Sequence, residues 1–123
     1  MLKLAIFWIL AQAGSLYLTW TAPGDDGDVG RAAEYDLRYC ADPLDSLNFG
    51  DAVRCAGVPA PDSAGTHQVF RVTGLEPGVR YWFALRTRDN AGNWSRLSNV
   101  ASRVARPEGV EAVVVATATR GGR

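Results

Sequence analysis

Residues 75–99, LEPGVRYWFALRTRDNAGNWSRLSN, decide the fold predicted for this chain. The Pro-Gly pair at the start is a turn signal, and apolar and polar side chains alternate after it, which indicates a half-buried strand. One face of that strand carries Tyr81, Phe83, Leu85 and Thr87, and the other carries Trp82, Ala84, Arg86 and Arg88. A second turn cluster at residues 89–93 leads into residues 97–104, so the stretch predicts a long antiparallel hairpin.

Two further strands precede this hairpin in the first third of the chain. Leu16, Leu18 and Trp20 alternate with polar residues, which predicts a strand with one apolar face and Trp20 near the centre of the core. Residues 33–40 predict a second strand, whose inward residues are Tyr35, Leu37 and Tyr39.

The middle of the chain, residues 41–65, is rich in turn residues and is expected to run over the surface. Inside it, residues 49–55 predict one short edge strand. Residues 68–73 predict another strand, with Val72 and either Val69 or Phe70 facing inward. Because no stretch shows sustained helical periodicity, the sequence predicts an all-β sandwich.

The composition favours a single domain without a strong electrostatic field. The 123 residues suffice for one hydrophobic core. Thirteen basic side chains balance thirteen acidic ones, so nothing would draw the protein to nucleic acid or to an anionic membrane surface. The apolar run at residues 4–10 is shorter than the ~20 residues that a membrane-spanning helix needs. We therefore expect no nucleic-acid partner and no transmembrane segment.

Two end segments, residues 1–14 and 107–123, are set apart from the domain at residues 15–106. The first has the order of a secretion signal, with Lys3, an apolar run and then small residues. The alternative is that residues 4–10 are the first strand of the sandwich. The Val-rich run at residues 110–119 has strong β-propensity and would be an aggregation hazard if it were exposed. It is expected either to pair with an edge of the sandwich or to begin a following module.

The two cysteines, Cys40 and Cys55, have no neighbouring His or Cys that would complete a zinc site. Both fall at the ends of predicted neighbouring strands, which favours a disulfide between them, and a disulfide would imply an oxidising compartment. The alternative is two reduced, half-buried thiols.

Three stretches together resemble a fibronectin type III domain of the kind common in bacterial extracellular proteins. They are LYLTWTAPGDDG with Trp20, EYDLRY with Tyr35, and LEPGVRYWFALRTRDNAGNWSRLSNV, which begins at Leu75. The resemblance covers residues 15–105 and implies an immunoglobulin-like Greek-key β-sandwich of two antiparallel sheets. It also implies that Tyr81 forms a tyrosine corner, in which the hydroxyl bonds to backbone a few residues upstream.

The residues offer little support for catalysis, a cofactor or a metal site. His67 is the only histidine, and no motif of nucleophile and base surrounds it, so a solvated position at the start of a strand is expected. Asp25, Asp26 and Asp28 lie in a Gly-rich loop that could suit Ca²⁺ but lacks the spacing of an EF-hand. A solvated turn is the preferred interpretation, and we expect a protein that is not an enzyme and holds neither metal nor cofactor.

The outward face of the hairpin strand is the first candidate for a partner surface. It places Trp82 near Arg86 and Arg88, with Arg38 on the neighbouring predicted strand, and Trp and Arg are enriched at binding hot spots. The same arrangement also suits a ladder of side chains that only covers the sheet, which is the preferred interpretation.

The expected function is a spacer, adhesion or protein-interaction module, secreted or in the cell envelope, with a protein or a cell-surface glycan as its partner. One alternative is a carbohydrate-binding accessory module, with Trp82, Trp94 and Tyr17 as stacking platforms. Another is a fragment of a larger secreted hydrolase. No oligomeric state is implied.

Overall fold

The computed structural model describes residues 14–23, 31–107 and 113–115. The interpretations of residues 1–13 as a signal or a strand, and of the acidic loop at Asp25, Asp26 and Asp28, lie outside the described residues. The same holds for the Val-rich run, except at Val113–Val115, where the backbone is described.

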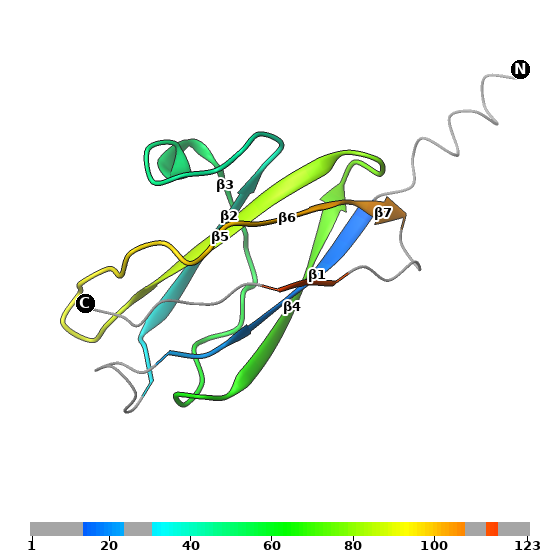
Figure 1. The fold of residues 1–123 in the computed structure, drawn as a ribbon. Helices are drawn as coiled ribbons and strands as arrows, with labels where there is room; N and C mark the ends of the chain where they lie inside the picture. Colours follow the sequence, from blue (N-terminus) through cyan, green and yellow to red (C-terminus); the bar gives the residue numbers. More distant parts are fainter. Residues whose placement is uncertain (1–13, 24–30, 108–112, 116–123) are drawn as a thin grey trace, which may run out of the picture.

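The described part of the chain forms two sheets that face each other (Figure 1). The first sheet consists of β4 (His67–Leu75), β1 (Gly14–Thr21), β7 (Arg106–Pro107) and β8 (Val113–Val115). The second sheet consists of β3 (Val53–Arg54), β2 (Glu34–Cys40), β5 (Arg80–Arg88) and β6 (Ala101–Val104). The prediction of an all-β sandwich is confirmed.

The core lies between the sheets and contains the predicted inward side chains of β1, β2 and β5. Trp20 of β1 is 1% exposed, and its ring meets that of Tyr35 on β2 edge to face, with centroids 5.2 Å apart. Leu75 at the end of β4 belongs to the same cluster and is also buried. Three residues that the resemblance singled out therefore meet in one core, although they come from three different strands.

The turn before β5 follows the pattern that its sequence predicts. The backbone N–H of Val79 donates to the carbonyl of Glu76 at 3.2 Å, and Gly78 has φ 89°, a conformation that suits glycine in the third position of a tight turn. The N–H of Glu76 donates to the hydroxyl of Tyr81 at 3.0 Å. This bond returns to backbone upstream of the tyrosine, as a tyrosine corner requires, with the hydroxyl as acceptor.

Replacing Tyr81 by phenylalanine is expected to lower the free energy of unfolding by about 1 kcal/mol, because Glu76 N–H loses its partner. Denaturant unfolding followed by fluorescence measures the change. Tyr39→Phe is the matched control, since the hydroxyl of Tyr39 makes no hydrogen bond to the described residues and its ring contacts that of Tyr81. Equal losses in the two variants would show that the bond to Glu76 contributes nothing.

The strand β8 pairs with β1 in parallel, whereas the other pairings are antiparallel. Val113, Val114 and Val115 lie opposite Tyr17, Leu18 and Thr19. The strand β7 pairs with Gly14 and Ser15 on the same edge of β1. Two alternatives were expected for the Val-rich run, and residues 113–115 follow the first, which is pairing with an edge of the sandwich.

The structure corrects two local predictions and decides one alternative that the sequence left open. Residues 49–55 form a short 3-10 helix, η1 (Phe49–Asp51), followed by the two-residue β3, because Phe49 folds back onto the outer face of the second sheet and is buried there. In β4, Val69 is 52% exposed, and Phe70 instead packs against the core beside Val72. The second strand of the hairpin begins at Ala101, rather than at residue 97, because serine side chains replace part of the regular strand pairing before it.

Candidate interaction surface

The outer face of the second sheet carries a cluster of charged side chains centred on Asp36. The Asp36 side chain is only 1% exposed. Arg38 donates to both of its oxygens, from Nε to Oδ1 at 2.9 Å and from Nη2 to Oδ2 at 3.2 Å. Arg86 donates to Oδ2 from Nε at 3.2 Å and from Nη2 at 3.1 Å, and Arg54 Nε lies 3.4 Å from Oδ1. A buried carboxylate is thus paired with three arginines from three strands.

A second carboxylate extends this cluster toward the end of the sheet. Glu34 accepts from Arg88 Nε and from Arg54 Nη2, both at 2.9 Å. Its side chain is 40% exposed, so these ion pairs are more open to water than those of Asp36. Arg54 joins the two carboxylates, and the six side chains together carry two more positive than negative charges, from four arginines and two acids.

The pKa of each of these carboxyl groups lies below its ordinary value. For Asp36, burial raises the pKa, but hydrogen bonds from Arg38 and Arg86 and the nearby arginine charges outweigh burial and lower it. For Glu34, the hydrogen bond from Arg88 is the main cause of the lowered pKa. Both groups are therefore ionised near neutral pH, as their contacts with arginine require.

The segment between β2 and β3 covers part of the same face, where its Leu44 and Phe49 form a small apolar cluster with Ala84 of β5. The guanidinium carbons of Arg38 and Arg86 lie 5.1 and 5.3 Å from the centre of the Phe49 ring, within the range of a cation-π contact. Trp82 is partly buried against the cluster. The prediction that Trp82 faces outward is correct, but the chain itself packs against this side chain.

The residues after β5 lie along its edge and are held by two serines, three positions apart. Ser95 N–H and Ser98 N–H donate to the carbonyls of Thr87 and Leu85, each at 2.8 Å. In return, Thr87 N–H donates to Ser95 Oγ at 2.9 Å, and Leu85 N–H donates to Ser98 Oγ at 3.0 Å. Each serine thus satisfies a donor and an acceptor of β5 that a regular strand would otherwise pair.

Replacing Ser98 by alanine is expected to lower the free energy of unfolding by about 1 to 3 kcal/mol, because the buried N–H of Leu85 loses its acceptor. Urea unfolding measures this loss. Ser102→Ala is the matched control, since among the described residues the Ser102 hydroxyl accepts only from the exposed Arg80 side chain, and it should change stability by less than about 0.5 kcal/mol. Equal stability of the Ser98 variant and the parent would contradict the role of the hydroxyl.

Trp94, which precedes Ser95, stacks on Arg86 of the charged cluster. The guanidinium carbon of Arg86 is 4.5 Å from the centre of the Trp94 ring. Since Arg86 also binds Asp36, Trp94 is linked through one side chain to the buried carboxylate. One face of Trp94 is therefore already used within the domain.

The three aromatic residues considered as sugar platforms are all engaged. Arg86 stacks on Trp94, Arg71 lies 5.7 Å from the centre of the Tyr17 ring, and Trp82 packs against the Phe49 cluster. Tyr17 belongs to the other sheet from Trp82, so the three rings do not form one platform. The geometry does not favour the carbohydrate-binding alternative.

The structure brings the predicted partner residues Arg38, Arg86 and Arg88 together, and all three are in ion pairs. This arrangement agrees with the preferred interpretation of a side-chain ladder on the sheet. The sequence interpretation missed Glu34, Asp36 and Arg54 as members. The two acids stand two positions apart in a predicted strand, opposite the arginines of the next strand, and this alternation was the available signal.

The predicted disulfide is not formed, and both cysteines are free thiols. Cys40 packs in the cluster of Leu44 and Phe49 on the outer face of the sheet, and its thiol donates to the carbonyl of Asp42 at 2.9 Å. Cys55 packs against the core between the two sheets. The prediction was wrong because the β2–β3 register places Cys55 beside Leu37 instead of Cys40, and the two cysteine side chains lie on opposite faces of the sheet. The cysteines therefore give no support to an oxidising compartment.

The remaining candidates for chemistry are His67 and the side chains that could hold a metal ion. His67 is exposed at the start of β4. Among residues 14–23, 31–107 and 113–115, no three His, Cys, Asp or Glu side chains gather where they could hold a metal ion. Across this same part of the chain, no helix has the length and apolar character to cross a membrane.

Part of this chain is similar in sequence to a stretch of several calcium-activated chloride channel regulators, which are much longer proteins. The chain is 31% identical over 96 residues to calcium-activated chloride channel regulator 3A-1 of Mus musculus, which covers 72% of this chain. It is 36% identical over 90 residues to regulator 1 of Sus scrofa and 32% identical over 92 residues to regulator 4 of Homo sapiens. The chain spans about a tenth of the length of these relatives. No protein-family model and no solved structure matches it.

Proposed function

We propose that this chain is a non-catalytic module of the fibronectin type III kind, which serves as a spacer or protein-interaction domain of an extracellular protein. The observation that carries the proposal is the length of the matches. They cover 90 to 96 residues, the size of this one sandwich, inside relatives about ten times longer. A stretch of this size that recurs within a longer chain is what a domain with its own core provides.

The cluster of charged side chains around Asp36 supports a structural role rather than a catalytic one, because its two carboxylates are paired with arginines. The most buried carboxylate, Asp36, is held by Arg38 and Arg86 and carries a lowered pKa. A general acid or base needs a pKa near the working pH, which this group lacks. The likeness to channel regulators supports the presence of a similar domain, and channel regulation itself belongs to the complete relatives.

The extracellular placement rests on the resemblance to modules of extracellular proteins and on the signal-like order of residues 1–14. It is tested by fusing the full chain to a reporter that is active only after export from a bacterial cell. Reporter activity that falls when residues 1–14 are removed supports the placement, and equal activity without them contradicts export by this segment.

The module role is tested with the full chain in isolation. We expect a single cooperative unfolding transition and no turnover of a panel of glycoside, ester and peptide substrates. Turnover that disappears in a His67→Ala variant would overturn the non-catalytic role. Loss of cooperative unfolding would show that the sandwich depends on a neighbouring domain and is not an independent module.

A further inference from the structure

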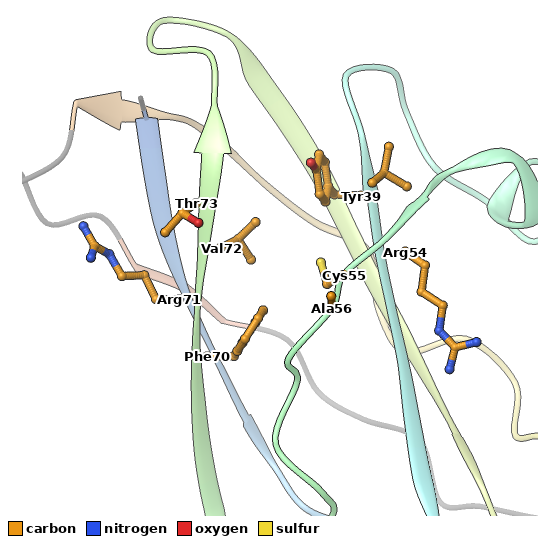
Figure 2. A pocket seen from close by; sticks show the side chains of 9 residues that line it. Tyr39, Arg54, Cys55, Ala56, Phe70, Arg71, Val72 and Thr73 are labelled. Atoms are coloured by element: carbon orange, nitrogen blue, oxygen red, sulfur yellow. The ribbon is translucent and has the colours of Figure 1, made fainter. Parts of the chain in front are cut away.

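The strand β1 has partners on both of its edges. β4 pairs with one edge between Gly14 and Thr21. On the other edge, β7 pairs with Gly14 and Ser15, and β8 pairs with residues 17–19. Figure 2, which looks into the groove beside β4, also shows the start of β1 between the arrowheads of β4 and β7. Within the described residues, the first part of β1 therefore has no edge free for another strand.

This pairing argues against one of the two interpretations of residues 1–14. A strand at residues 4–10 would be joined to β1 by residues 11–13 alone. Strands that follow each other through so short a connection form a hairpin and pair side by side. The edges of β1 are instead paired with β4, β7 and β8, which all come later in the chain. A first strand at residues 4–10 has no place beside β1.

The surroundings of Gly14 are crowded by the turn that follows β4. A Cβ at this position would lie 2.9 Å from the carbonyl oxygen of Leu75 and 3.2 Å from that of Arg106. It would also lie 3.2 Å from the backbone nitrogen of Pro77. The turn that begins at Glu76 therefore lies directly against the first residue of β1, where only glycine fits.

This turn restricts where the preceding chain can lead. A strand beyond the far edge of β4 would lie two strand spacings from β1, or about 10 Å. Residues 10 and 14 can be at most about 14 Å apart, so little chain is left to pass around the turn. On the opposite edge of β1, β8 lies close to β6 of the second sheet, so the way to β6 is occupied as well.

The order of residues before Gly14 fits removal of the segment instead. Lys3 precedes the apolar run at residues 4–10, and Ala11 and Ala13 stand third and first before Gly14. Small residues at these two positions mark the bond that is cleaved when a leader is removed during export. The segment is slightly shorter than the usual leader of about 15 to 30 residues, and its apolar run is at the lower end of the usual range of about 7 to 15.

We propose that the peptide bond between Ala13 and Gly14 is a processing site, which a leader peptidase hydrolyses during export. Water adds across the bond, so that its C–N bond breaks, Ala13 keeps a carboxylate and Gly14 gains a free α-amino group. The core residues Leu16, Leu18 and Trp20 remain on the processed chain. This inference deepens the proposed extracellular placement, on which it rests, because it names the bond that export would cleave.

The N-terminus of the exported protein tests the site. The full chain, with an affinity tag at its C-terminus, is produced in a bacterium, and the periplasmic and membrane fractions are analysed by intact mass and N-terminal sequencing. We expect a periplasmic chain that begins at Gly14. Ala13→Arg should lower the yield of this chain at least tenfold and leave the full-length chain at the membrane, because a large charged side chain then stands directly before the bond.

Gln12→Arg is the matched control for Ala13→Arg. It introduces the same side chain one position earlier, between the two small residues, where the pattern sets no requirement. The yield of the chain that begins at Gly14 should stay within about twofold of the parent. Equal losses in the two variants would show that added charge, and not the residue before the bond, controls processing, and this result would overturn the proposal.

Stability provides a second test that does not depend on the peptidase. The processed chain from the periplasm and the full chain from the cytoplasm, both reduced, should unfold at the same urea concentration. A lower midpoint for the processed chain would show that residues 1–13 stabilise the sandwich as a strand does, and it would overturn the proposal.

The N-terminus also separates this proposal from the one on which it rests. A periplasmic chain that keeps residues 1–13, or that begins at another residue, would refute the site at Gly14 and leave the extracellular placement standing. A full-length chain found only in the cytoplasm would refute both. Neither outcome changes the unfolding cooperativity or the substrate panel, so the module role is tested separately.

Discussion

Replacing Trp20 by alanine is expected to lower the free energy of unfolding by about 3 to 5 kcal/mol, the range for removing a large aromatic residue from a core. Trp20 is 1% exposed and contacts Tyr35 from the facing sheet, so the lost ring leaves a cavity that both sheets border. Because small domains are stable by only about 5 to 15 kcal/mol, the variant should be close to unfolding at 37 °C. Thermal and denaturant unfolding followed by circular dichroism measure the loss.

Trp94→Ala is the matched control for this substitution. The same ring is removed, but from the surface, where it stacks on Arg86 and is only partly buried. We expect a loss below about 1 kcal/mol, the usual value for an exposed cation-π contact. If the two variants lost equal stability, the core would not be centred on Trp20.

Replacing Asp36 by alanine is expected to cost about 3 kcal/mol of unfolding free energy. Removing one partner of a buried ion pair leaves the other charges without compensation. Here Arg38, Arg54 and Arg86 would face each other around an empty position. We place the cost at the lower end of the usual range because the arginine side chains are 17% to 45% exposed and can reach water.

Glu34→Ala is the control for Asp36→Ala, since Glu34 also binds two arginines but is 40% exposed. Its loss should stay below about 1 kcal/mol, as for other exposed pairs. Equal losses in the two variants would mean that burial does not decide the contribution of Asp36.

The same cluster predicts how stability changes with pH. The pKa of Asp36 is lowered from its ordinary value of 3.8, so its ion pairs stabilise the folded state above that pH. This stability should decrease as the pH falls below about 4, through the pKa of the folded state. In Asp36→Ala the decrease should be smaller, and an unchanged acid profile in unfolding measurements between pH 2 and 6 would contradict it.

The strands that the sequence predicted best are those with one apolar and one polar face. Leu16, Leu18 and Trp20 face the core as their alternation predicts, and so do Tyr35 and Leu37. Alternation is a local property, because successive side chains in a strand point to opposite faces. The turn at Pro77 and Gly78 was also predictable from the sequence. Its third position has a positive φ, which glycine adopts easily, and proline favours the position before it.

The predictions that failed depended on distances between residues far apart in the chain. Cys40 and Cys55 both stand near strand ends, but their side chains lie on opposite faces of one sheet. The edge strand predicted at residues 49–55 became η1 and β3, because the Phe49 side chain is buried over Ala84 of β5. Neither outcome can be read from local pattern, since each depends on which strands become neighbours.

The sequence by itself determined the class of fold, the strands and the residues that face the core, because the two-residue period and the turn residues act locally. Only the tertiary structure decided which charges meet. Asp36 is one polar residue among many in the sequence, and it becomes a buried carboxylate only when β2, β3 and β5 align three arginines around it. Within the described residues, it also decided that β1 is paired on both sides and β4 on one, because strand order follows from packing between sheets.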